Sequence, residues 1–125
     1  MRALVVDDSK AIRRILTQML VSMGLDVSEA GDGKEAFQVV ESSDLFDFAL
    51  VDWNMPEMNG YELVCEIRKH SKYDNMRLMM VTTETEMSQV VKALEAGANE
   101  YVMKPFTKEM IQEKLSLMGI AVNPL

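Results

Sequence analysis

Five polar side chains that could together carry out phosphoryl chemistry follow apolar runs in this sequence: Asp7, Asp8, Asp52, Thr82 and Lys104. Gathered carboxylates repel one another, since two like charges about 4 Å apart cost roughly 4 kcal/mol at an effective dielectric of about 20. Such a cluster needs a cation, and oxygen ligands at a solvent-open site favour Mg²⁺, which accepts a phosphate oxygen. A threonine hydroxyl and a lysine ammonium are donors suited to phosphate oxygens. The residues therefore predict a magnesium-assisted phosphoryl site with Asp52 as the nucleophile.

Asp52 has the most informative surroundings. It ends the apolar run 46–51 and is followed by a turn-forming segment that contains Pro56 and Gly60, and then by a new amphipathic run. A strand, an acid, a loop and a helix in this order is how the open edge of an α/β sheet presents a side chain to a ligand. The other acids and the lysine can be interpreted by asking whether they reach Asp52.

Short apolar runs alternate with amphipathic segments along the whole chain, which predicts five strands and five helices. The predicted strands span residues 3–6, 25–30, 46–51, 78–81 and 100–103. The third helix is expected over 59–70 and the fourth over 86–96. Helix caps are expected at Ser9, Asp32, Asn59 and Thr107, with a capping box between Asp32 and Glu35, and helix stops at Gly24, Gly97 and Gly119.

This alternation also predicts the topology. Right-handed crossovers give a parallel sheet with helices on both faces, and all strands of such a sheet end at the same edge. The expected fold is a flavodoxin-like, doubly wound (βα)5 sheet. If its strand order is 2-1-3-4-5, the switch point lies between strands one and three. Asp7, Asp8 and Asp52 should meet at this switch point, with Thr82 and Lys104 to one side.

Composition limits the function classes. A chain of 125 residues fits one domain, 1–125, in which residues 119–125 form a short apolar tail. A net charge of −7 argues against a nucleic-acid partner. The single cysteine excludes an intrachain disulfide and fits a reducing compartment. No apolar run approaches transmembrane length, so we expect no membrane insertion and a cytoplasmic location.

The motifs resemble those of a known family. They are Val5-Val6-Asp7-Asp8-Ser9, Val51-Asp52-Trp53-Asn54-Met55-Pro56, Asn59-Gly60, Val81-Thr82, Ala96-Gly97-Ala98 and Lys104-Pro105-Phe106. Together they resemble the receiver domain of two-component response regulators, and in particular the single-domain chemotaxis regulators of the CheY type. The resemblance covers residues 3–117.

The resemblance implies a role for each site residue. Asp52 would accept a phosphoryl group from a phosphohistidine on a sensor histidine kinase, and Lys104, before a cis peptide to Pro105, would pair with that group. Thr82 would turn toward the phosphoryl group and Tyr101 would swing inward behind it. The protein's ligands for Mg²⁺, or Mn²⁺ in its place, would be Asp8 directly, Asp7 through water, Asp52 and the backbone carbonyl of Asn54.

The output surface is expected on the fourth helix, fifth strand and fifth helix. Val90, Tyr101, Met103 and Lys114 are the predicted partner-binding residues, because a patch that mixes aliphatic, aromatic and cationic side chains suits a peptide. By resemblance the partner is the flagellar motor switch, and a phosphatase is a further possible partner. The protein itself would be a phosphoacceptor and not an enzyme with a separate substrate.

Other functions fit parts of the same pattern. A stand-alone receiver for a non-motor partner, or a phosphorelay intermediate, would use the same site. A magnesium-dependent phosphatase of the haloacid-dehalogenase type also has a strand-end aspartate, but it needs a second acid where this chain has Asn54. A receiver from a DNA-binding regulator would need its output in another protein.

Three residues near Asp52 have open interpretations. Trp53 could flank the rim of the site as an optical reporter, or be half-buried packing. Glu84 could influence dephosphorylation, or be a solvated loop acid. Thr83, where chemotaxis regulators often have a smaller alanine, could narrow access to an acyl phosphate.

Overall fold

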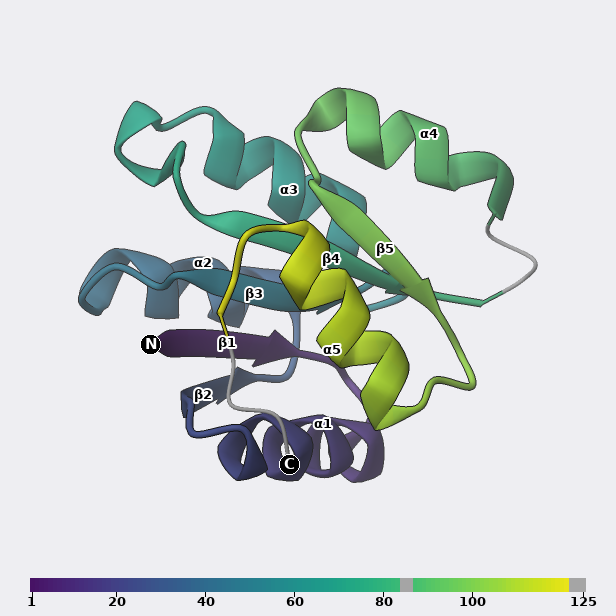
Figure 1. Ribbon diagram of the computed structural model, residues 1–125. Helices are drawn as coiled ribbons and strands as arrows, with labels where there is room; N and C mark the ends of the chain where they lie inside the picture. The colour runs from purple at the N-terminus through teal and green to yellow at the C-terminus, as the bar shows by residue number, and fades with distance from the viewer. Residues whose placement is uncertain (84–86, 122–125) are drawn as a thin grey trace.

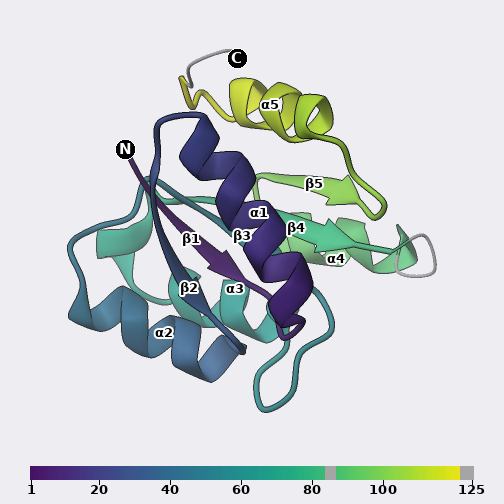
Figure 2. The same cartoon turned by 90° about the horizontal axis from the view of Figure 1, so that it is seen from below.

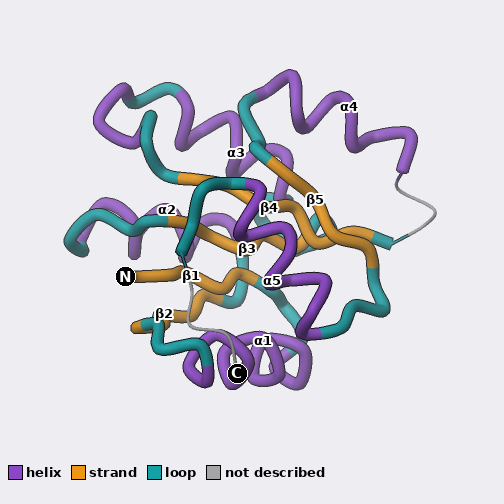
Figure 3. The backbone as a smooth tube through the Cα atoms, viewed as in Figure 1, coloured by secondary structure: helices purple, strands orange, loops and turns teal. Residues whose placement is uncertain are grey.

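A computed structural model describes residues 1–83 and 87–121, so that Glu84 lies outside the described residues. The strands are β1 (Arg2–Val6), β2 (Asp26–Ala30), β3 (Phe48–Asp52), β4 (Arg77–Thr82) and β5 (Glu100–Met103). The helices are α1 (Lys10–Ser22), α2 (Gly33–Ser42), α3 (Gly60–Arg68), α4 (Met87–Ala96) and α5 (Lys108–Leu117), with a short 3-10 helix at Ser71–Tyr73. Strands and helices alternate as predicted (Figure 3).

The strands form one parallel sheet in the order β2-β1-β3-β4-β5, which confirms the predicted flavodoxin-like fold. Helices α1 and α5 cover one face, and α2, α3 and α4 cover the other (Figures 1 and 2). Because all five strands are parallel, their carboxyl ends meet at one edge, where the predicted site residues lie.

No helix in the described ranges is long and apolar enough to cross a membrane.

Strand β3 lies at the centre of the sheet, and each of its five residues is buried. Phe48 and Leu50 belong to the apolar cluster under α1 and α5, while Ala49 and Val51 belong to the cluster under the other helices. Apolar side chains on both faces are what a strand covered by two helix layers requires. This central strand holds Asp52 rigidly at the edge of the sheet.

Some predicted boundaries were wrong. Strand β3 begins two residues later than expected, because Phe46 is buried beneath the Arg2 guanidinium, 4.5 Å from its ring centroid, and not by pairing in the sheet. Strand β2 begins at Asp26, since Leu25 still belongs to the turn after α1. The third helix ends at Arg68, two residues earlier than expected, and a 3-10 helix follows at Ser71–Tyr73.

The predicted caps are present. Ser9, Asp32, Asn59 and Thr107 each accept a hydrogen bond from a backbone N–H of the first helical turn. The capping box is found at α3, whereas Glu35 in α2 accepts from the Gly31 N–H instead of the cap residue. The three predicted helix stops have positive φ angles: Gly24 at 87°, Gly97 at 122° and Gly119 at 83°.

Candidate functional site

Three carboxylates converge at the carboxyl edge of the sheet. Asp7 and Asp8 follow β1, and Asp52 ends the neighbouring strand β3. One carboxylate oxygen from each residue lies within 4.8 Å of those of the other two. Asp7 and Asp52 are buried, and Asp8 is exposed to solvent. The cluster therefore opens to solvent on the side of Asp8.

The turn after β1 holds Asp7 through several of its polar groups. Its N–H donates to the Ala30 carbonyl at 3.2 Å, and its Oδ1 accepts from the Ser9 N–H at 2.8 Å. Its Oδ2 is buried and accepts no hydrogen bond within the described structure. A buried carboxylate oxygen without a hydrogen bond is costly, because desolvation removes its water and nothing replaces it fully.

Lys104 supplies the positive charge at this edge. Its Nζ lies 3.0 Å from Asp52 Oδ1 and 3.5 Å from Asp7 Oδ2. Its peptide bond to Pro105 is cis, as the resemblance implied. One ammonium faces three carboxylates, so the ionised cluster has two negative charges in excess.

The electrostatics of Asp52 reflect this excess. The pKa of Asp52 is raised from 3.8 to about 6, chiefly because burial disfavours the charged carboxylate; the hydrogen bond from Lys104 opposes this rise, and the charges of Asp7 and Asp8 contribute to it. Burial tends to lower the pKa of Lys104, but the nearby carboxylates of Asp52 and Asp7 raise it overall. The donor set, with a buried oxygen that accepts no hydrogen bond, fits a hard divalent cation that prefers oxygen ligands.

The loop after Asp52 is held close to the strand by Gly60. A side-chain carbon on Gly60 would lie 2.3 Å from the Asp52 carbonyl oxygen, so only glycine fits at the start of α3. The Gly60 N–H donates to the Trp53 carbonyl at 2.9 Å. Asn54 lies in this loop and is exposed.

Thr82 ends β4 next to the cluster and is fully buried. Its hydroxyl donates to the Thr83 carbonyl at 2.8 Å. In the next strand, Tyr101 is half-buried and packs against the cluster of apolar residues beneath α2, α3 and α4. Thr83 is half-buried and takes part in interactions of its own.

The predicted output patch is only partly assembled. Lys114 Nζ lies 4.8 Å above the Tyr101 ring and 3.2 Å from Glu100 Oε1, and Met103 is half-buried on the same strand. The prediction for Val90 was wrong, because its side chain is buried and only 3% exposed.

Among the α4 residues whose burial the structure describes, the exposed large apolar side chains are Val91, which is 61% exposed, and Leu94, which is 38% exposed. One helical position separates Val91 from the predicted residue Val90, which is enough to turn a side chain from the core toward solvent.

Trp53 is a packing residue, since it is only 5% exposed. Its ring stacks on the ring of Tyr61, with centroids 6.0 Å apart. Lys92 Nζ of α4 lies 4.4 Å from the centroid of the Tyr61 ring. The stack connects the residue after Asp52 to α4, and it was not predicted from the sequence. An aromatic residue two positions after the α3 cap was the available signal.

Sequence analysis also did not single out Arg13. This α1 side chain donates from Nη1 to the Asp7 carbonyl at 2.7 Å and pairs through Nε with Glu29 at 2.9 Å. Its position four residues after the Ser9 cap, one turn along the helix, was the only signal that it could reach the end of β1.

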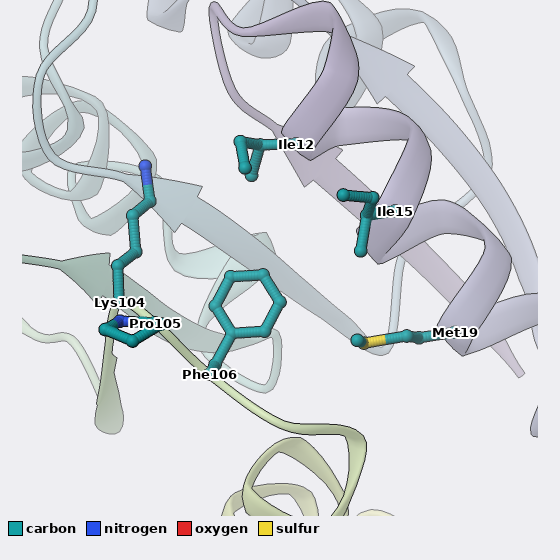
Figure 4. A pocket seen from close by; sticks show the side chains of 6 residues that line it. All are labelled: Ile12, Ile15, Met19, Lys104, Pro105 and Phe106. Atoms are coloured by element: carbon teal, nitrogen blue, oxygen red, sulfur yellow. The ribbon is translucent and has the colours of Figure 1, made fainter.

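An apolar groove adjoins Lys104 between α1 and the segment before α5. It has a volume of about 400 Å³, and the lining side chains of the two segments face each other across it (Figure 4). The lining residues are Ile12, Ile15, Met19, Lys104, Pro105 and Phe106.

The chain is similar to known proteins over nearly its whole length. Residues 3–116 match the family model described as response regulator receiver domain. The chain is 47% identical over 116 residues to a chemotaxis protein CheY homolog of Campylobacter jejuni, covering 92% of this chain and 89% of that protein. It is 42% identical over 119 residues to chemotaxis protein CheY1 of Helicobacter pylori, covering 94% and 96%.

A solved structure shares the fold. The chain is similar to chemotaxis response regulator CheY4 of Vibrio cholerae with a TM-score of 0.86 and 34% identity, covering 94% of this chain and 97% of that one. The similarity therefore extends over the sheet edge that carries the three carboxylates.

Proposed function

The chain belongs to the response regulator receiver domain family, and from this we propose that it is a phosphorylation-activated module of a two-component system with Asp52 as its phosphoacceptor. The observation that carries the proposal is the convergence of Asp7, Asp8 and Lys104 on Asp52 at the edge of the sheet. A carboxylate on the central strand, with an ammonium 3.0 Å away, is held where an incoming phosphoryl group could be attacked.

In the proposed transfer, a carboxylate oxygen of Asp52 forms a bond to the phosphorus of a phosphohistidine. The phosphorus–nitrogen bond breaks, and the imidazole of the sensor kinase leaves with the bonding electrons. Phosphoryl transfer needs positioning and neutralisation of charge more than acid–base chemistry. Lys104 provides part of that neutralisation, because its ammonium is already directed at Asp52.

The proposed cofactor is Mg²⁺, for which Mn²⁺ can substitute. Asp8 and Asp52 would bind it directly, Asp7 through water, and Asn54 through its backbone carbonyl. When bound, the ion offsets the negative charge of the carboxylates and of the phosphoryl oxygens. The buried Asp7 Oδ2, which accepts no hydrogen bond within the described structure, supports a cation at this cluster.

Phosphorylation is proposed to act through Thr82 and Tyr101. A phosphoryl group on Asp52 adds charge and acceptor oxygens that can capture the Thr82 hydroxyl from the Thr83 carbonyl. A shift of Thr82 would open space for Tyr101 to move inward. The resulting change would bias the surface formed by α4, β5 and α5, with coupling of typically about 1–3 kcal/mol.

We propose chemotaxis as the pathway, since the similar proteins of Campylobacter and Helicobacter carry that name. The upstream partner would be a sensor histidine kinase. The output partner would be the flagellar motor switch, which would bind Tyr101, Met103 and Lys114, together with exposed α4 residues such as Val91 in place of Val90. Cytoplasmic location and action without a separate small-molecule substrate follow from this function.

The metal part of the proposal can be tested with Asp8→Ala. This variant should lose the Mg²⁺-induced change in Trp53 fluorescence, because one direct oxygen ligand is gone, and its phosphorylation by acetyl phosphate should fall to background. The matched control is Asp26→Ala, which removes the same charge from an exposed position. Asp26 is the first residue of β2 and so lies at the opposite edge of the sheet from the cluster. An Asp8→Ala protein with the parent's metal dependence and labelling rate would refute the proposed site.

The switch can be tested with Thr82→Ala. This variant should accept phosphate but lose most of the gain in partner affinity that beryllofluoride gives the parent, which corresponds to about 5- to 150-fold for typical coupling. Thr82→Ser keeps the hydroxyl and should retain the gain.

Lys114→Ala should weaken partner binding and leave phosphorylation unchanged. Partner affinity is measured by calorimetry with a motor-switch peptide, and equal affinities of the parent with and without beryllofluoride would contradict the switch.

A further inference from the structure

We propose that Arg13 is a positioning residue for the divalent cation, in that it holds the Asp7–Asp8 peptide so that both carboxylates face the cluster. This inference rests on the proposed metal site. It assigns a role to a side chain that lies outside the cluster and touches neither the cation nor the phosphoryl group.

The contact to the backbone is direct. Arg13 Nη1 donates to the Asp7 carbonyl oxygen at 2.7 Å. That carbonyl belongs to the peptide unit that joins Asp7 to Asp8. The orientation of this peptide plane therefore determines the direction in which the Asp8 backbone and side chain leave the turn. The Arg13 N–H also donates to the Ser9 carbonyl at 2.9 Å, which places the guanidinium on the first turn of α1.

The guanidinium is itself held by strand β2. Its Nε pairs with Glu29 Oε1 at 2.9 Å, and the Arg13 side chain is only 19% exposed. The guanidinium also lies close to Gly31, where a side-chain carbon would be 3.4 Å from Arg13 Nη1. The planar guanidinium makes both bonds from one rigid group, so arginine loses less side-chain conformational entropy for each hydrogen bond than lysine would.

With this contact, the N–H, the carbonyl and Oδ1 of Asp7 are each hydrogen bonded. The remaining polar atom, Oδ2, accepts no hydrogen bond and lies 3.5 Å from Lys104 Nζ. The turn therefore directs Oδ2, which is paired only with the Lys104 ammonium within the described structure, into the cluster. Removal of the Arg13 side chain would leave a backbone carbonyl unpaired and free the turn to reorient.

Simple electrostatics predicts the opposite effect of the same change. The guanidinium is a positive charge beside a cation site, so its removal should strengthen binding of a cation. A positioning role predicts weaker binding, because partners behind metal ligands are typically worth about 10- to 100-fold in metal affinity. The sign of the change therefore separates the two explanations.

The experiment is a titration of the full chain with Mg²⁺ alone, followed by Trp53 fluorescence and by calorimetry. Arg13→Met, which removes the charge but keeps a straight side chain, should bind Mg²⁺ about 10-fold more weakly than the parent. Arg14→Met removes the same charge from the next, exposed position of α1 and should bind like the parent or slightly more tightly. At saturating Mg²⁺, the phosphorylation rate of Arg13→Met should return close to the parental rate.

Arg13→Lys tests geometry at constant charge. Lysine can replace one of the two bonds, so this variant should bind Mg²⁺ more weakly than the parent but more tightly than Arg13→Met. Parental affinity in Arg13→Lys together with unchanged or tighter binding in Arg13→Met would overturn the inference. A parent that binds no Mg²⁺ would instead refute the proposed metal site, which distinguishes the two failures.

Discussion

Replacement of Asp52 by asparagine is expected to reduce phosphorylation by acetyl phosphate and Mg²⁺ to background. The amide cannot form the acyl phosphate, because its nitrogen replaces one carboxylate oxygen and its remaining oxygen is a poor nucleophile. The parent should gain one phosphoryl group by intact mass, and the product should be labile to alkali, as expected for an acyl phosphate. Peptide mapping after trapping with hydroxylamine should locate the modification at Asp52 alone.

Two controls make this result specific. Asp26→Asn removes a carboxylate from an exposed site on β2 and should be labelled like the parent. Folding of Asp52→Asn is checked by circular dichroism, so that loss of labelling is not loss of structure. Labelling that persists in Asp52→Asn would move the chemistry to another residue.

Without divalent cations, the contribution of Asp52 to folding stability is expected to disappear as the pH rises through about 6. The folded-state pKa of Asp52 is raised from 3.8 to about 6, first of all by burial, so the folded protein binds a proton that the unfolded chain has already released. This contribution is complete below about pH 3.8 and is lost above about pH 6. Its size is on the order of 3 kcal/mol, at 1.36 kcal/mol for each pKa unit.

The free energy of unfolding in urea with a chelator, measured between about pH 4 and about pH 7.5, tests this expectation. Asparagine resembles the protonated acid in shape, so Asp52→Asn should lack this part of the pH slope and be about 1–3 kcal/mol more stable than the parent near neutral pH. Titrating groups that do not interact with Asp52 are common to both proteins and cancel in the difference. Parallel pH profiles would show that the Asp52 carboxylate is not destabilising in the folded state.

Both predictions follow from a conflict between function and stability in the same side chain. A carboxylate that is buried beside Asp7 and Asp8 lowers the stability of the fold when it ionises. The same crowding makes the cluster a ligand for a cation, which should restore stability by binding only the folded protein. Added Mg²⁺ should therefore stabilise the parent more than Asp52→Asn.

The order of the elements and the edge of the sheet on which the site lies could be predicted from residue types and spacing. Caps such as Ser9 and Asn59 and stops such as Gly24 act within one or two turns of chain, so their effect can be predicted locally. Acids at the ends of two parallel strands must share an edge, and the strand order then places Asp52 next to β1. These conclusions needed periodicity and handedness alone.

Which side chains of a helix are buried depends on tertiary packing. Val90 is buried while Val91 is exposed, a difference of one position that depends on how α4 is rotated against its neighbours. The burial of Trp53 depends on Tyr61 and Lys92, which come from two different helices. Helix rotation and stacking are set by packing over long range, which no local pattern encodes.

The same reason explains why Arg13 and the electrostatics of Asp52 emerged only from the structure. The contact between Arg13 and the Asp7 carbonyl requires α1, β1 and β2 to lie at their packed distances. The raised pKa of Asp52 requires both its burial and the approach of two acids from another strand. Residue types and spacing show which groups could meet, but desolvation and hydrogen-bond geometry depend on atomic distances that exist only after the layers have packed.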